Sequence, residues 1–206
     1  MLLALLLALM APLPFAQEVQ RAYAQQDPDT LTTLLAEADS RADSLLVRYR
    51  LYPLTENASL LDDLPTRLPD GSARETALLS GLWSYRAGEA SIFSAVQYGR
   101  RSANILTRAK EQNPDEPYVL LIEGQSLLFR PAIAGRDPTA AADCFERLAA
   151  QADTTAGITT TEAQVWRWLA LKEAGHADAA QRIHDRLLQD DLAPLYRQFL
   201  EAPPDV

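Results

Sequence analysis

The sequence contains one cysteine, Cys144, and two histidines, His176 and His184, among its 206 residues. A single cysteine excludes an intramolecular disulfide, so the fold cannot depend on one. The two histidines lie on one expected helix and do not supply the three or four converging ligands that a zinc site needs. We expect His184 to pack in the core and Cys144 to lie beside Phe145 on a buried helix face. No histidine is placed there to activate a thiolate nucleophile.

The motifs of the common enzyme classes are also missing. The sequence has no glycine-rich phosphate loop, no G-x-S-x-G motif and no H-E-x-x-H motif. The adjacent acidic residues at 62/63 and 190/191 are expected at helix ends or in loops, where solvated or capping roles dominate. We therefore predict that the protein is not an enzyme and holds no metal ion or cofactor.

Basic residues are fewer than acidic ones. The sequence has 19 Lys and Arg residues and 28 Asp and Glu residues, which gives a formal net charge of −9. Only Lys110 and Lys172 are lysines, and no basic stripe is visible in the sequence. Binding to a phosphate backbone requires clustered Lys and Arg, so we predict no nucleic-acid partner and no anionic membrane surface as a partner. The hydrophobic content of 48% is enough for a buried core in one domain.

The N-terminus has the pattern of a secretory signal peptide. An apolar run over residues 2–11 is followed by Pro12 and Pro14, and it is too short to span a bilayer. We predict a signal peptide over residues 1–16 with cleavage after Ala16, and a periplasmic or secreted protein with no stable membrane span afterwards. Cleavage after Ala24, an uncleaved anchor and a misassigned start codon are the alternatives. No cysteine lies near the junction, which excludes a lipoprotein anchor.

Strand patterns are absent, because no run of four to eight residues alternates β-branched and polar side chains. The sequence therefore predicts an all-α fold of antiparallel helical hairpins. A first helix is expected over residues 30–50, ending before Pro53, and a loop-rich link follows it. Further helices are expected over residues 73–86, 89–112, 116–129, 139–151, 161–174 and 177–190. We divide the chain into an N-terminal helix and link (17–71), a helical repeat domain (72–191) and a C-terminal cap and tail (192–206).

Three of the expected helix ends repeat one another. The segments ILTRAKEQ, CFERLAAQ and IHDRLLQD begin at Ile105, Cys144 and Ile183, at an interval of 39 residues, and each has Arg in its fourth place. The same interval relates Ala141 to Ala180. Self-similarity with a period of 20 to 50 residues is typical of stacked supersecondary units.

These units resemble tetratricopeptide repeats (TPR). The first helix of a unit has spaced large and small residues, as in Leu120, Gly124 and Leu127. The second helix has a small residue, an aromatic residue four places later and an apolar residue three places after that. Ala141, Phe145 and Leu148 fit this pattern, and Ala180, His184 and Leu187 fit it with His in the aromatic place. The resemblance covers roughly residues 72–191 and implies a short right-handed solenoid whose first helices line a concave side.

The middle unit has an unusually long turn between its helices, in LLFRPAIAGRDPTAAADCFERL from Leu127 to Leu148. This stretch is similar to that of a group of uncharacterised exported bacterial TPR proteins, in which Pro and a glycine-rich turn also split the hairpin. Pro131 ends one helix, and Asp137 can cap the next with Pro138 at its first position. The turn is therefore either a structural loop or a contact site.

The first helices and the long turn supply the candidate binding residues. Aromatic and Arg side chains dominate binding hot spots, and an Arg can receive a carboxylate through two hydrogen bonds. The candidates for partner binding are Tyr85, Arg86, Tyr118, Gln125, Arg130, Arg136, Trp166 and Arg167. We expect Trp83 and Trp168 to pack between helices instead.

The leading functional hypothesis is a non-catalytic exported scaffold that binds a protein or peptide in the cell envelope. The alternative is a small-ligand carrier, like the TPR components that accompany solute transporters. The first predicts an open concave groove, and the second predicts an enclosed pocket lined by Arg and aromatic side chains.

Overall fold

The computed structural model describes residues 13–152 and 157–206, and within them the chain forms ten α-helices, two short 3-10 helices and no strand. The α-helices are α1 (Phe15–Ala24), α2 (Pro28–Glu37), α3 (Arg41–Thr55), α4 (Ala73–Gly88), α5 (Ile92–Gln112), α6 (Pro117–Phe129), α7 (Pro138–Gln151), α8 (Thr160–Glu173), α9 (Ala177–Leu187) and α10 (Pro194–Glu201). The 3-10 helices are η1 (Ala58–Leu61) and η2 (Ala132–Ala134). The prediction of an all-α fold is confirmed for these residues. No helix in this part of the chain is long and apolar enough to cross a membrane.

The predicted single helix over residues 30–50 is wrong, because two helices, α2 and α3, occupy this region. The chain leaves the helical conformation at Ala38, and Ser40 then caps α3 by accepting a hydrogen bond from the amide of Asp43 at 3.0 Å. The expected stop before Pro53 is also wrong, since α3 continues to Thr55 with Pro53 in its last turn. A helix cap therefore overrode a continuous apolar pattern at one end, and a proline was accommodated at the other.

The helix α1 was not expected from the sequence. It begins at Phe15, so the predicted cleavage position after Ala16 lies in its first turn. Val19 of α1 is fully buried, and α1 packs on α2 and α3. Most of the predicted signal peptide, residues 1–12, lies outside the described residues.

Consecutive helices pack against each other along the rest of the chain: α4 on α5, α6 on α7, α7 on α8 and α8 on α9. The hydroxyl of Ser102 in α5 donates to the carbonyl of Ser80 in α4 at 2.9 Å and lies 2.8 Å from the hydroxyl of Ser84. Gly124 brings α6 close to α7, because a Cβ at this position would lie only 2.5 Å from the ring of Phe145. Small residues thus set the short distances between paired helices.

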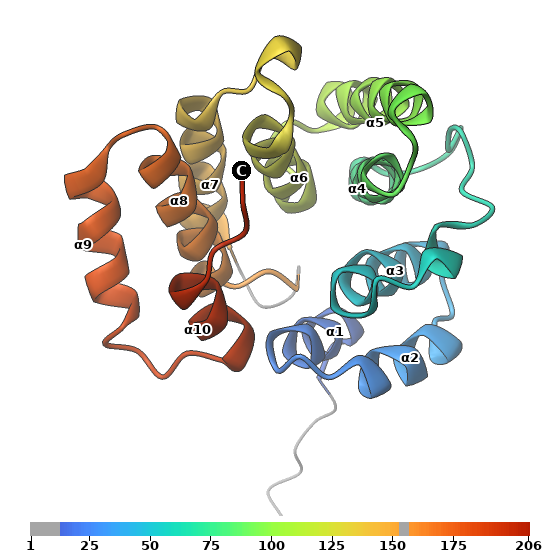
Figure 1. Cartoon of the computed structure of the whole chain (residues 1–206). Coiled ribbons are helices and arrows are strands. Elements are labelled where there is room, and N and C mark those ends of the chain that lie inside the picture. Colours follow the sequence, from blue (N-terminus) through green and yellow to red (C-terminus); the bar gives the residue numbers. More distant parts are fainter. Residues whose placement is uncertain (1–12, 153–156) are drawn as a thin grey trace, which may run out of the picture.

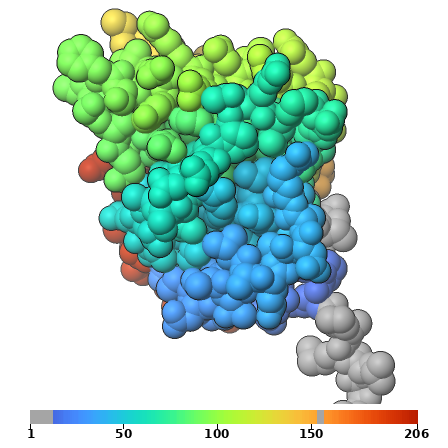
Figure 2. Space-filling view, turned by 90° about the vertical axis from the view of Figure 1, so that its right-hand side faces the viewer, coloured from blue at the N-terminus to red at the C-terminus, as the bar shows by residue number. Residues whose placement is uncertain are grey.

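The helices follow one another around a ring, so that the C-terminal helix α10 returns to α1 (Figure 1). The side-chain amide of Gln20 in α1 donates to the hydroxyl of Tyr196 in α10 at 2.9 Å. In Figure 1, α4, α6 and α8 lie toward the centre, and α5 and α9 lie on the outside. Figure 2 shows one outer face, where the link between η1 and α4 runs between the N-terminal helices and α5. The first and the last helix of the described chain therefore meet.

A buried charged pair joins α3 to α8 across the ring. Arg50 of α3 and Glu162 of α8 are 2% and 1% exposed, and their paired atoms lie 2.5 Å and 3.0 Å apart. Burial lowers the pKa of Arg50, but the neighbouring Glu162 charge more than offsets it, so the pKa of Arg50 stays well above its ordinary value. The guanidinium also lies over the rings of Tyr23, Tyr49 and Tyr118 at 4.6–5.7 Å. The inner side of the ring is thus packed with side chains.

Candidate interaction site

Most of the candidate binding residues on the first helices make contacts inside the chain. Tyr118 is fully buried, and its hydroxyl donates to the carbonyl of Gly157 at 3.2 Å. Tyr85 stacks on Tyr49 and Tyr52, and Gln125 accepts a hydrogen bond from the hydroxyl of Tyr49. The structure therefore places Tyr118 in the core. Tyr85 of α4 and Gln125 of α6 contact α3 instead of facing solvent.

The remaining first-helix candidates are half-buried. Trp166 lies among the rings of Phe129, Phe145 and Phe199, with centroid distances of 4.8–6.0 Å. Arg167 of α8 forms an ion pair with Glu146 of α7 at 2.7 Å. Arg86 donates to the carbonyl of Leu61 at 2.5 Å. Each of these side chains joins one helix to another element.

The arginines of the long turn are also used locally. Arg130 donates to the carbonyl and hydroxyl of Ser126 at 2.9 Å and 3.0 Å. Arg136 donates to the carbonyl of Leu128 at 3.0 Å and forms an ion pair with Glu173 at 2.6 Å. These contacts favour the structural interpretation of the turn.

The predicted cap of the next helix is confirmed, since the Asp137 carboxylate accepts from the amide of Ala140 at 3.0 Å. The turn nevertheless presents Ile133, which is 99% exposed and was not among the candidates.

Three exposed apolar side chains lie close together at the start of α5. Ile92, Phe93 and Val96 are 82%, 92% and 52% exposed. Residues 92, 93 and 96 lie within about one turn of each other on one helix, so their side chains form one patch. By contrast, Trp83 and Trp168 are buried, as predicted from the sequence.

The same helix has a charge opposite to that of the chain. The stretch from residue 90 to 110 has four basic residues and no acidic one, although the whole chain has a net charge of −9. Lys110 pairs with Glu123 of α6. Arg100, Arg101 and Arg108 form no ion pair with a carboxylate of the described residues. Three unpaired guanidinium groups therefore follow the apolar patch along α5.

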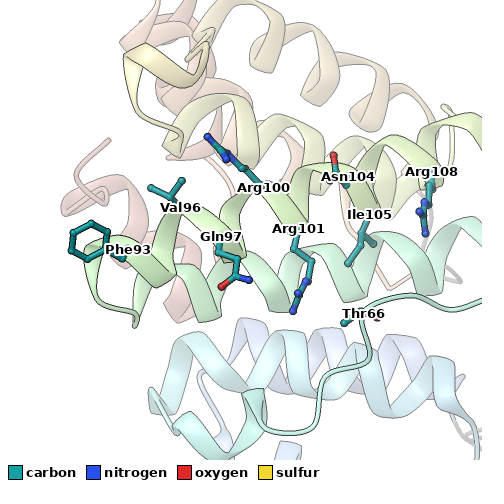
Figure 3. Close-up of a pocket in the computed structure, with 9 residues that line it drawn as sticks. All are labelled: Thr66, Phe93, Val96, Gln97, Arg100, Arg101, Asn104, Ile105 and Arg108. Atoms are coloured by element: carbon teal, nitrogen blue, oxygen red, sulfur yellow. The ribbon is translucent and has the colours of Figure 1, made fainter.

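A groove of about 470 Å³ runs along these side chains (Figure 3). Eight of its lining residues come from α5, and Thr66 of the preceding link forms the facing edge. The lining residues are Thr66, Phe93, Val96, Gln97, Arg100, Arg101, Asn104, Ile105 and Arg108. Phe93 and Val96 line one end, and the arginines line the middle and the other end (Figure 3).

Trp83 holds the two edges of the groove together. Its indole N–H donates to the carbonyl of Pro65 at 3.0 Å, which fixes the link next to Thr66. The guanidinium of Arg101 lies over the indole ring, 4.5 Å from its centroid. A guanidinium stacked on an aromatic ring keeps its N–H edges free to bind an anion. The Trp83 ring thus fixes the position of the Arg101 charge in the groove.

Other reactive groups have environments that the structure explains. Burial raises the pKa of the Cys144 thiol to about 11, which keeps it protonated near neutral pH. His184 is half-buried against the ring of Trp168, with 5.5 Å between the centroids. Among the described residues, no three His, Cys, Asp or Glu side chains gather as a metal site would require.

The sequence reasoning missed the α5 groove because it took the first helix of each pair as the binding face. One signal was present: the absence of acidic residues between positions 90 and 110 in an acidic chain. The spacing of Phe93, Val96, Arg100 and Asn104 by three or four residues then places them on one side of a helix. No family model, curated protein or solved structure matches this chain.

Proposed function

We propose that this chain is an exported, non-catalytic scaffold of TPR-like helix pairs that mediates protein–protein interaction in the cell envelope. The observation that carries the proposal is the patch of Ile92, Phe93 and Val96, which stands out from an ordered helix into solvent. Fully burying a large apolar side chain contributes about 1.5–3 kcal/mol. Contiguous exposed apolar side chains beside polar ones mark interaction sites in soluble proteins. A partner that covers this patch gains that free energy.

The TPR-like part of the proposal is supported by the burial of equivalent positions. Ala141 and Ala180, which lie 39 residues apart, are both buried, and so are Leu148 and Leu187. The small residue Gly124 in α6 meets the Phe145 ring in α7. Repeated positions thus have repeated packing roles, which is what stacked helical units require.

The export part of the proposal rests on the apolar run over residues 2–11, and the packing of α1 bears on where cleavage would occur. Cleavage after Ala24 would remove all of α1, including the fully buried Val19 and the Tyr23 ring that lies 4.6 Å from the Arg50 guanidinium. Cleavage after Ala16 keeps both. The folded structure therefore favours the earlier of the two candidate positions, and mass spectrometry of the mature chain would measure which one is used.

The small-ligand alternative has less support. It calls for an enclosed pocket, but the centre of the ring holds the Arg50–Glu162 pair and tyrosine rings. The α5 groove lies on the outside of the ring and is open along one helix (Figures 1 and 3).

An affinity purification from envelope extract tests the proposed function. The bait is the mature chain, and the variant Phe93→Ser/Val96→Ser removes two of the three side chains of the apolar patch without touching the core. Leu188→Ser is the matched control, because Leu188 is a 54% exposed apolar residue just after α9. We expect a protein that is retained by the wild type and the control and lost by the patch variant.

Equal retention by the patch variant would contradict the proposal. Sedimentation equilibrium of the purified chain accompanies this experiment, because self-association lost in the patch variant would show that a second copy covers the patch.

A further inference from the structure

We infer that the α5 groove binds an acidic peptide segment of a partner protein, with a large apolar side chain of that segment against Phe93 and Val96. This inference rests on the proposed function and specifies its partner. The carboxylates of the segment would bind Arg100, Arg101 and Arg108. Because the apolar side chains lie at one end of the groove and the arginines follow along α5, the segment should have an apolar residue at one end and acidic residues toward the other.

The charges of α5 argue for an anionic partner. Arg100 and Arg108 are exposed, and neither forms an ion pair with a carboxylate of the described residues. Exposed carboxylates are plentiful elsewhere on a chain with 28 acidic residues. Guanidinium groups bind carboxylates through paired, charge-assisted hydrogen bonds. The groove is therefore complementary to an acidic partner and distinct from the rest of the chain.

The dimensions of the groove argue for a short segment. Residues 93 to 108 span about 22 Å of helix at 1.5 Å per residue. An extended peptide of roughly seven residues has that length at about 3.3 Å per residue. Thr66 of the link lies opposite the Arg101 and Ile105 part of the groove (Figure 3).

Two other anionic partners fit the groove less well. A nucleic-acid backbone would gain nothing from Phe93 and Val96, and the net charge of −9 would repel a long polyanion. A lipid bilayer can receive apolar and basic side chains together, but its flat surface does not fill a groove. An acidic, partly apolar peptide uses both halves of the site.

The test is selection from a displayed library of random peptides of about 12 residues against the purified mature chain. We expect enriched peptides with several Asp or Glu residues and a large apolar residue toward one end. Their affinity, measured by fluorescence polarisation, should fall at least tenfold in Arg100→Glu/Arg108→Glu and in Phe93→Ser/Val96→Ser. It should also weaken with added salt, since the arginines are exposed.

Arg182→Glu/Arg186→Glu is the matched control, because these two exposed arginines lie four residues apart on α9. This variant should bind the selected peptides as the wild type does. Circular dichroism of each variant confirms that the fold is kept.

The outcomes separate this inference from the proposed function. Enriched peptides that lack acidic residues, or that bind the α5 variants as well as the wild type, would overturn the inference about the groove. They would not contradict the proposed scaffold function. A selection that enriches nothing would overturn the inference, and the affinity purification with Phe93→Ser/Val96→Ser would still test the proposed function. Sedimentation with vesicles of anionic lipid runs in parallel, and vesicle binding that depends on Arg100 and Arg108 without any peptide binding would assign the groove to a membrane surface instead.

Discussion

Replacing Arg50 by Met should destabilise the protein strongly, because it leaves the Glu162 carboxylate buried without its partner. The two residues lie 112 positions apart in the sequence and join α3 to α8 across the ring. Both side chains are almost completely removed from solvent. Removing one member of such a pair costs about 3–5 kcal/mol, since the remaining charge has no water to compensate it. The carbonyl of Gly157 would lose its bond from Arg50 but keep the one from Tyr118.

Urea unfolding followed by circular dichroism and by tryptophan fluorescence measures this loss. Thermal unfolding reports the same change as a lower Tm. For a chain of this size, a loss of about 3–5 kcal/mol corresponds to a fall in Tm of roughly 6–20 °C. The double variant Arg50→Met/Glu162→Met should recover most of the loss, because apolar side chains of similar volume can replace a buried pair. Arg147→Met is the control, since the Arg147–Asp115 pair is exposed and should contribute less than about 1 kcal/mol.

A loss below about 1 kcal/mol in Arg50→Met would refute this reasoning. It would show that water reaches Glu162 and that the centre of the ring is open. A double variant as unstable as the single one would also contradict it, because the penalty would then come from lost packing and not from an unpaired charge.

Three further predictions concern packing and titration. Gly124→Ala should destabilise the fold by about 1–3 kcal/mol in urea unfolding, because the new methyl group would press on the fully buried Phe145 ring; an unchanged midpoint would show that α6 and α7 can separate freely. Cys144, whose thiol pKa burial raises to about 11, should react with a disulfide reagent at pH 8 roughly 100-fold more slowly than in the unfolded chain, and equal rates would place the thiol at the surface. Burial raises the pKa of Tyr23 to about 12, so the folded state keeps a proton that the unfolded state loses. Stability should therefore fall between pH 10 and pH 12, less steeply in Tyr23→Phe, and a flat profile would contradict this.

The helices over residues 73–187 could be predicted from the sequence because local signals agree there. Asp137 followed by Pro138 starts α7, and an apolar stripe continues to the end of the helix. The prediction for the N-terminal region was wrong for local reasons as well. Ser40 caps a new helix inside a continuous apolar pattern, and residues 15–24 were divided between a signal peptide and a link although they form α1.

The closure of the ring could not be predicted from the sequence. It depends on pairs that lie far apart along the chain, such as Arg50 with Glu162 and Gln20 with Tyr196. No local pattern specifies which distant residues meet. This closure also explains why the candidate residues on the first helices failed to form a surface: the inner side of the ring is filled, and the open groove lies on α5 outside it.

Photo-crosslinking from position 93 in the host cell envelope tests the central claim most directly. A photoreactive benzoyl-phenylalanine at this position keeps an aromatic side chain where Phe93 is 92% exposed, and the same residue at position 188 is the control. If the chain is a scaffold that binds through α5, position 93 should give one discrete protein adduct that position 188 does not give, and the Arg100→Glu/Arg108→Glu change should abolish it. No adduct from position 93, or the same adducts from both positions, would contradict the proposed function.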